Sequence, residues 1–239
     1  ADPLKTIAEA KALADTYDQG EAKAAPGVNM RHVKLFMDGI INAPADTGAM
    51  LAPYLRNAGT DTTPKWTPGK NTGELYFPSQ VLNPLLLQAV QAGLDPHLHA
   101  TGDRAVRDSL NGIEYVRRQL PGNGFRPAIT HAESVDPADY PRFKALDVTA
   151  NMSFQWAQQA PSTVDGTNEH LGPARFARME PSGSIARAGG RVAYGSDWPV
   201  DPLDEFLALK IGVTRSGDPL NPHSYGPKYA GRLNADPAL

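Results

Sequence analysis

Residues 95–120 read Asp-Pro-His-Leu-His-Ala-Thr-Gly-Asp-Arg-Ala-Val-Arg-Asp-Ser-Leu-Asn-Gly-Ile-Glu-Tyr-Val-Arg-Arg-Gln-Leu. The first six residues form a short stretch bounded by turn residues, which predicts a strand over 95–100. From residue 103 onward apolar residues recur at helical spacing, which predicts an amphipathic helix over 103–120. A second strand is predicted over 128–132, where the sequence is Ala-Ile-Thr-His-Ala. A strand, a helix and a strand in this order indicate a parallel sheet.

The same alternation extends toward both ends of the chain. Further strands are predicted at 32–37, 148–153 and 192–196, and further helices at 2–20, 83–93, 136–145, 181–189 and 204–214. Two long connections, 38–83 and 154–180, are predicted as loops, and the aromatic residues of the first favour a folded lid over disorder. Residues from 216 onward are predicted as a loop-like tail. The composition shows no break, so we expect a single domain over 1–239. Five strands suit either an open doubly wound α/β sheet or part of a (β/α)8 barrel, and the periodicity alone does not decide between them.

The composition excludes several classes of protein. The chain has 239 residues and no cysteine, which rules out disulfide scaffolds, thiolate zinc sites and cysteine nucleophiles. Any metal ligand must be His, Asp, Glu or a modified Lys. A net charge of −3 without a basic cluster argues against nucleic acid as a partner. No apolar run reaches the roughly 18 residues of a membrane span, which argues against a membrane. The first residues show no secretory signal pattern, which favours the cytoplasm.

Four ionisable side chains fall in or at the ends of predicted strands. Lys34 lies in the first strand, His99 and His131 lie near the ends of two others, and Asp197 follows the last. Taken singly, each side chain also has a structural interpretation. His99 or His131 could be a hydrogen-bonded core histidine, Asp197 a turn aspartate, and Lys34 a lysine that reaches solvent. Because parallel strands present their ligand sites at their carboxyl ends, we expect the four to converge. Together they favour a metal site.

Other chemistries fit the sequence less well. It contains neither a Gly-x-Gly-x-x-Gly motif nor a phosphate-binding P-loop. The Tyr-Gly-Ser-Asp segment at 194–197 lacks the second glycine of a Gly-x-Ser-x-Gly nucleophile turn. An anion site at the start of the helix near Gly102 is opposed by Asp103, which is better interpreted as an N-cap.

Four segments together resemble a known family. They are Val-Lys-Leu-Phe-Met-Asp-Gly (33–39), His-Leu-His-Ala-Thr-Gly-Asp-Arg-Ala-Val (97–106), Ala-Ile-Thr-His-Ala-Glu (128–133) and Ala-Tyr-Gly-Ser-Asp-Trp-Pro-Val (193–200). In this order they resemble the amidohydrolase superfamily, in the branch called amidohydrolase family 3, and the resemblance covers nearly the whole chain.

The resemblance implies a (β/α)8 TIM-like barrel with one or two divalent ions, usually zinc, at the carboxyl ends of its strands. Lys34 matches a lysine that is carbamylated in several members and bridges two metals. His99 and His131 match metal-binding histidines. Asp197 matches a metal-site aspartate that orients or deprotonates the attacking water, as a catalytic residue does. Residues that support these ligands or contact the substrate are expected to be His97, Asp103, Arg104 and Trp156.

The sequence also departs from the family pattern. It lacks the His-x-His pair of the first barrel strand, and the small β-sandwich built from both chain ends is not recognisable. Thr130 stands where the family often has Glu, and Pro127 where it often has His. The chain therefore resembles strands four to eight of an incomplete barrel with long βα loops. Since a partial barrel leaves open sheet edges, we expect a homo-oligomer or a missing segment to cover them.

The leading interpretation is a metal-dependent amidohydrolase that cleaves a C–N bond in a small amide, carbamate or cyclic amide. Aromatic residues of the long loops are expected to form a wall for an apolar substrate group: Tyr54, Trp66, Trp156 and Phe176. Because the His-x-His pair is absent, a catalytically incomplete chain that acts as a binding or regulatory module remains the alternative. An unrelated open α/β binding protein is a third.

Overall fold

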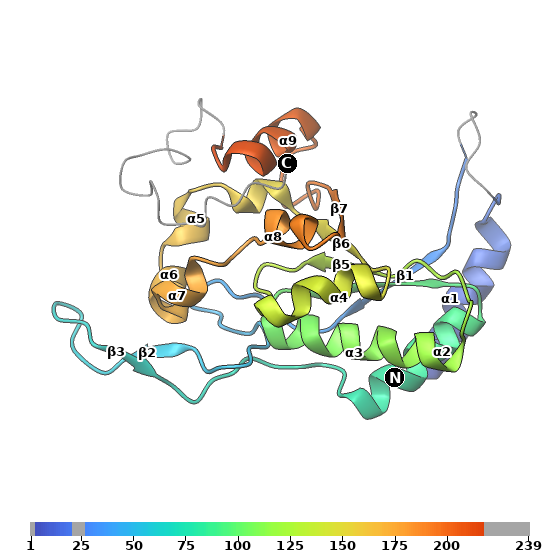
Figure 1. Cartoon of the computed structure of the whole chain (residues 1–239), viewed down its shortest axis with the longest axis horizontal. Helices are drawn as coiled ribbons and strands as arrows, with labels where there is room; N and C mark the ends of the chain where they lie inside the picture. The colour runs from blue at the N-terminus through green and yellow to red at the C-terminus, as the bar shows by residue number, and fades with distance from the viewer. Residues whose placement is uncertain (1–2, 21–26, 218–239) are drawn as a thin grey trace.

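The computed structural model describes residues 3–20 and 27–217. Its main sheet contains β1 (His32–Phe36), β4 (Asp95–Ala100), β5 (Ala128–His131), β6 (Thr149–Met152) and β7 (Arg191–Tyr194), all parallel and adjacent in chain order (Figure 1). A doubly wound sheet reverses its strand order at a switch point, and this sheet does not. The order is that of consecutive strands of a (β/α)8 barrel, so the prediction of an incomplete barrel is confirmed.

One face of the sheet carries the main hydrophobic core. Leu98, Ile129 and Ala150 point to this face and pack with buried residues of the helices. The helices that follow or connect the strands are α2 (Ser79–Gln91), α3 (Asp103–Gln119), α4 (Tyr140–Ala145) and α8 (Ser182–Arg187), with α1 (Pro3–Tyr17) and α9 (Glu205–Thr214) toward the chain ends. Figure 1 shows α2, α3 and α4 in front of the sheet.

Helix α3 follows directly from its sequence pattern. Val106, Leu110 and Ile113 recur on one stripe and are fully buried. Burying such a side chain contributes about 1.5–3 kcal/mol, so this stripe fixes the helix on the sheet. Near the end of the helix, Arg117 donates hydrogen bonds to the carbonyl oxygens of Phe125 and Leu146, which anchors the chain that leads into β5.

The opposite face of the sheet is accessible at β1. Side chains alternate along this strand, and His32, Lys34 and Phe36 are exposed while the two residues between them are partly buried. Parallel strands covered on both faces are apolar throughout. The polar residues of β1 therefore reflect a sheet face that the described helices do not cover at this edge.

The first long connection contains regular structure that the sequence does not predict. It contains an antiparallel pair, β2 (Leu55–Asn57) and β3 (Trp66–Pro68), which projects at the opposite end of the molecule from α1 (Figure 1). The Asn57 side chain accepts hydrogen bonds from the backbone N–H groups of Gly59 and Lys65, and so holds the hairpin turn. These two three-residue strands are too short for a recognisable period.

The second long connection also differs from the predicted loop. It contains a 3-10 helix, η2 (Phe154–Ala157), and three short helices, α5 (Pro161–Val164), α6 (Thr167–Leu171) and α7 (Pro173–Phe176). Two of them begin with proline at the first helical position, where its missing N–H costs nothing. Each has only four or five residues, which is too short to show a helical repeat.

Several predicted boundaries require correction. Helix α2 begins at Ser79 and not at residue 83, and Pro84 lies inside it, because the buried Leu82 extends the apolar stripe toward the N-terminus. Helix α4 is preceded by a 3-10 turn, η1 (Pro137–Asp139), which Asp136 caps by accepting a hydrogen bond from Ala138 N–H. The predicted tail from residue 216 lies almost wholly outside the described residues, as does the start of the first helix at residue 2.

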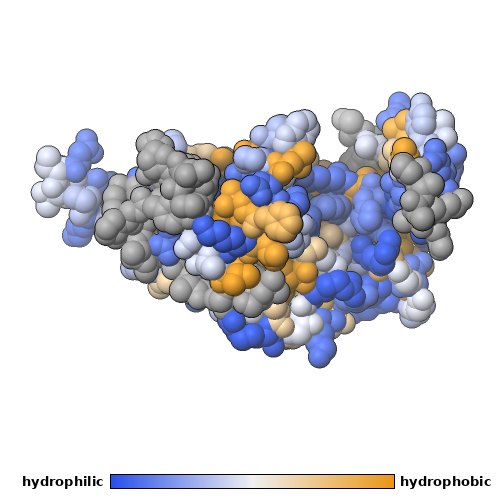
Figure 2. Space-filling model, turned by 90° about the horizontal axis from the view of Figure 1, so that it is seen from above, coloured by the Kyte–Doolittle hydropathy of each residue, from blue (hydrophilic) through white to orange (hydrophobic). Residues whose placement is uncertain are grey.

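Large apolar side chains are exposed in the loop after β7 and on α9. Trp198, Leu203 and Phe206 are 66%, 71% and 88% exposed. Figure 2 shows apolar surface gathered over the part of the molecule where α9 lies. Among the described residues, no helix combines the length and the apolar character needed to cross a membrane.

Candidate functional site

A cavity of about 620 Å³ brings the four predicted site residues together. Lys34 comes from β1, His99 from β4, His131 from the end of β5, and Asp197 from the loop after β7. Residues from the surrounding loops complete the lining: Phe36, Ile40, Asn42, Glu133, Gln155, Trp156, Gln158, Thr163, Trp198, Pro199, Val200 and Asp201. The cavity therefore gathers side chains from most of the parallel strands.

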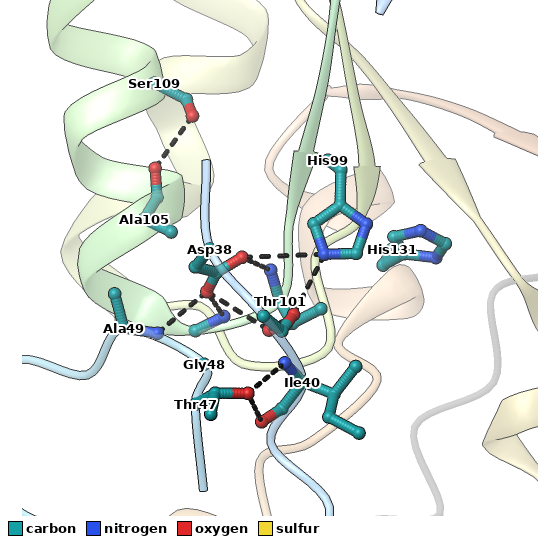
Figure 3. A network of polar contacts seen from close by, with 12 residues as sticks. Asp38, Ile40, Thr47, Gly48, Ala49, His99, Thr101, Ala105, Ser109 and His131 are labelled. Carbon is teal, nitrogen blue, oxygen red and sulfur yellow. Dashed lines mark hydrogen bonds and ion pairs between the residues drawn. The ribbon is translucent and has the colours of Figure 1, made fainter. Parts of the chain in front are cut away.

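The contacts of His99 orient its imidazole ring. Its Nε2 lies 2.9 Å from the carbonyl oxygen of Gly39, which only accepts hydrogen bonds, so Nε2 carries the proton (Figure 3). Its Nδ1 is buried and has no hydrogen-bond partner. In the neutral ring this nitrogen holds a free lone pair. The ring packs edge-on against His131, with the ring centres 4.6 Å apart.

His131 is held between a hydroxyl group and an indole. Its Nδ1 lies 3.2 Å from Ser153 Oγ, and its ring stacks on Trp156 with an interplanar angle of 4° and 4.5 Å between centres. Burial, reinforced by His99 and Lys34, lowers the pKa of His131 to about 3. His131 is therefore neutral at physiological pH, which is the state in which histidine binds metal ions.

Lys34 and Asp197 line the same cavity. Lys34 Nζ is 5.0 Å from the centre of the Phe36 ring. Asp197 has a left-handed backbone with φ of 54°, and its carbonyl oxygen accepts a hydrogen bond from Val200 N–H. Within residues 3–20 and 27–217, no three His, Asp or Glu side chains converge closely enough to form a complete metal-binding group.

A network around Asp38 was not predicted from the sequence. The buried Asp38 carboxylate accepts hydrogen bonds from the backbone N–H groups of Ala49, Thr101 and Gly102 at 2.8–2.9 Å (Figure 3). His99 Nε2 lies 3.7 Å from the same carboxylate. Asp38 thus joins the end of β1, the following loop and the turn into α3. The sequence feature that could have indicated Asp38 is the Asp-Gly pair directly after the first strand.

Three of the predicted supporting residues do not line the cavity. His97 contacts the Thr130 hydroxyl, and burial, with Lys34 as the next cause, lowers the pKa of His97 to about 4. Asp103 is not an N-cap: Gly102 holds that position, and the Asp103 carboxylate accepts a hydrogen bond from Leu51 N–H. The Nε atom of Arg104 lies 3.9 Å from Oδ2 of Asp108 on the surface of α3. His97 and Asp103 therefore contact neighbouring segments, whereas Arg104 pairs with a residue of its own helix.

The predicted aromatic wall is present only in part. Trp156 lines the cavity, whereas Phe176 is buried in a separate cluster with Tyr54. Tyr54 and Trp66 instead line a second pocket of about 360 Å³ beside the hairpin. The exposed Trp198, which follows Asp197, takes the place of the missing aromatic residues at the cavity.

Two buried glutamates, of which Glu133 lines the cavity, were also missed. Glu133 and Glu180 are 3% and 2% exposed, and Glu180 N–H donates to the carbonyl oxygen of Glu133. Burial and the nearby charges of Glu180 and Asp38 raise the pKa of Glu133 well above its usual range. Burial raises the pKa of Glu180 to about 7, against the opposing effect of Arg215. Glu133 belongs to the predicted His-Ala-Glu segment, but nothing in that pattern marks it as buried.

The raised pKa of Glu180 predicts a pH-dependent stability. Between its unfolded value of 4.5 and its folded value of about 7, the folded state binds more protons, so the free energy of unfolding falls as pH rises. A Glu180→Gln variant removes this loss and is expected to be more stable than the wild type at pH 8 by up to about 3 kcal/mol, with little difference at pH 4. Urea denaturation at several pH values measures this. Parallel curves for the two proteins would contradict it, and Glu9→Gln on α1 is the exposed control.

Residues 2–228 match the model of the amidohydrolase family. The chain belongs to this family. Two curated relatives are a Bacillus subtilis protein named "Putative amidohydrolase YtcJ", 25% identical over 90% of this chain, and the exoenzymes regulatory protein AepA of Pectobacterium carotovorum, 26% identical over 79%. The matched region is 36% of the length of each relative, so this amidohydrolase-family chain spans about a third of them.

Two solved structures with a similar fold are from Pyrococcus species. An uncharacterized metal-dependent hydrolase from Pyrococcus furiosus matches 93% of this chain and 41% of its own, with a TM-score of 0.66. Its counterpart from Pyrococcus horikoshii matches 89% and 38%, with a TM-score of 0.67. Both are 21% identical, and this likeness establishes the fold.

Proposed function

We propose that this chain forms part of a divalent-metal hydrolase that cleaves a non-peptide C–N bond in a small amide, carbamate or cyclic amide. The observation that carries this proposal is the single cavity on which Lys34, His99, His131 and Asp197 lie. Membership of the amidohydrolase family supports it.

The histidine pair fits a divalent ion, for which we propose zinc, as one ion or two. His99 presents a buried, unpartnered Nδ1, and His131 is neutral because its pKa is lowered. Neutral imidazole nitrogens are preferred zinc ligands. Asp197 and, if carbamylated, the exposed Lys34 would add oxygen ligands from the same cavity. An ion held there supplies Lewis acidity, which polarises a carbonyl group and activates water near neutral pH.

The other side chains position the substrate and move protons. Asp197 accepts a proton from the attacking water and returns it to the leaving amine, as a general base and then a general acid. The Gly39 carbonyl keeps His99 in one tautomer and one orientation. Trp156 and Trp198 offer apolar walls for the rest of the substrate.

Metal content tests this proposal. The wild-type chain is expected to bind zinc, and His99→Ala and His131→Ala to lose most of it, because each removes a ligand nitrogen. His32→Ala is the matched control, since His32 lies on the same exposed face of β1 but does not line the cavity. Elemental analysis and titration with zinc measure binding, and release of amine from a panel of N-acyl amides measures activity. Equal metal content in all four proteins would overturn the proposal.

A binding or regulatory module is the second candidate. The observation that favours it is that the described residues contain no close group of three His, Asp or Glu ligands. In that case the wild-type chain would bind no zinc and release no amine in the same assays.

A further inference from the structure

Glu133 occupies an unusual position at the cavity. It follows His131 by two residues, lines the cavity and is only 3% exposed. Its Oε1 is fully buried and has no hydrogen-bond partner. Buried polar atoms are almost always paired in folded proteins, because an unpaired one costs about 1–3 kcal/mol or more. The site therefore lacks a donor that would complement this carboxyl group.

The charges around Glu133 define what that donor would be. The acidic side chain of Glu180 is also buried, and Glu180 N–H donates to the carbonyl oxygen of Glu133. The guanidinium group of this region, Arg215, donates to the carbonyl oxygen of Glu180 and lies 3.5 Å from Ser182 Oγ. Glu133 Oε1 therefore has no donor among the described residues, and a cationic N–H group bound in the cavity would supply one.

The cavity walls accept a cation of moderate size. The volume of about 620 Å³ accommodates a small organic molecule. Aromatic faces also attract cations, and Trp156 and Trp198 line the same space.

We propose that Glu133 is the substrate-recognition carboxylate of this cavity and that the substrate carries a cationic nitrogen, an ammonium or amidinium group, in addition to the bond that is cleaved. This inference names the substrate class of the proposed hydrolase, and it rests on that proposed function. The binding preference itself depends only on the cavity and on Glu133.

Two nearly isosteric probes test the preference without any hydrolysis. Benzamidine is cationic at pH 7.5 and benzamide is neutral, and their binding to the full chain in metal-free buffer is measured by calorimetry or ligand-observed NMR. The wild type is expected to bind benzamidine at least about tenfold more tightly, as hydrogen bonds to charged groups do. Glu133→Gln is expected to reduce this ratio to near one. Glu133→Asp, which keeps the charge on a shorter side chain, is expected to restore part of it.

Matched controls separate recognition from general effects. Asp201→Asn makes the same change of charge elsewhere on the cavity wall and is expected to keep the preference. Glu133→Gln removes a like charge from a buried acidic group, so its thermal midpoint is expected to equal or exceed that of the wild type. Equal binding of both probes to the wild type, or an equal loss of preference in Asp201→Asn, would overturn the inference.

The outcomes also distinguish this inference from the proposed function. A cation preference that depends on Glu133, in a chain that hydrolyses no amide, sustains the recognition role and refutes hydrolysis by this chain. Hydrolysis of neutral amides with no cation preference sustains the proposed function and refutes the role of Glu133.

Discussion

An Asp197→Asn variant is expected to lose amide hydrolysis by about 10²- to 10⁴-fold, which is the usual contribution of a positioned acid–base group. The carboxylate that accepts and returns the proton is replaced by an amide that does neither. Asparagine tolerates left-handed backbone better than most residues, so the φ of 54° at this position is preserved. The loss should therefore fall on kcat with little change in KM, measured on the best substrate of the amide panel.

Asp147→Asn is the matched control for that prediction. Asp147 also has a left-handed backbone, with φ of 50°, but it is exposed and pairs with Arg191 on the surface. Its replacement tests the same chemical change in the same backbone conformation away from the cavity. A loss of less than about tenfold in Asp197→Asn would contradict the assignment of Asp197 as the acid–base group, since tenfold lies below the range expected of one.

Replacement of Asp38 by alanine is expected to cost at least about 3 kcal/mol of unfolding free energy. The carboxylate is the hydrogen-bond acceptor for three buried backbone N–H groups, and each unsatisfied group costs about 1–3 kcal/mol. These donors belong to the loop after β1 and to the turn into α3, so both segments would loosen. Because Gly39 orients His99, zinc affinity should fall in the same variant.

Urea denaturation at pH 7 measures this effect, and Asp61→Ala provides the comparison. Asp61 lies at the exposed tip of the β2–β3 hairpin, where a surface substitution changes stability by about 0.5 kcal/mol or less. If Asp38→Ala were as stable as Asp61→Ala, the backbone donors would have to find other acceptors, and the network would not be the link between the two segments.

The sequence predicted the parts of the fold that carry a local period. Helix α3 shows its apolar stripe over 17 residues, and the strands stand out between turn residues. The hairpin strands and helices α5 to α7 have three to five residues each, which is less than two repeats of any helical period. Their positions depend on turn contacts such as that of Asn57, and these become visible only when the backbone is placed.

The candidate site also contains some residues that could be predicted from the sequence and others that could not. His99, His131 and Asp197 could be predicted to converge because the carboxyl ends of parallel strands meet at one edge. The Asp-Gly pair after the first strand marks the position of Asp38, but the contacts of Asp38 and the burial of Glu133 could not be predicted from residue type and spacing. The partners of Asp38 are backbone N–H groups 11 to 64 residues away, and Glu133 is distinguished by a partner that it lacks.

The register of the sheet has a consequence for how this chain tolerates insertions and deletions. Lys34 lies opposite His97, and His99 lies opposite Phe36 on one side and Thr130 on the other. Because side chains alternate along a strand, adding or removing one residue within β4 would turn His99 from the cavity toward the helices and bring Leu98 or Ala100 in its place. The hairpin tip between β2 and β3 has no such constraint. The chain can therefore change length at its loops, while the spacing inside its strands determines which side chains the cavity contains.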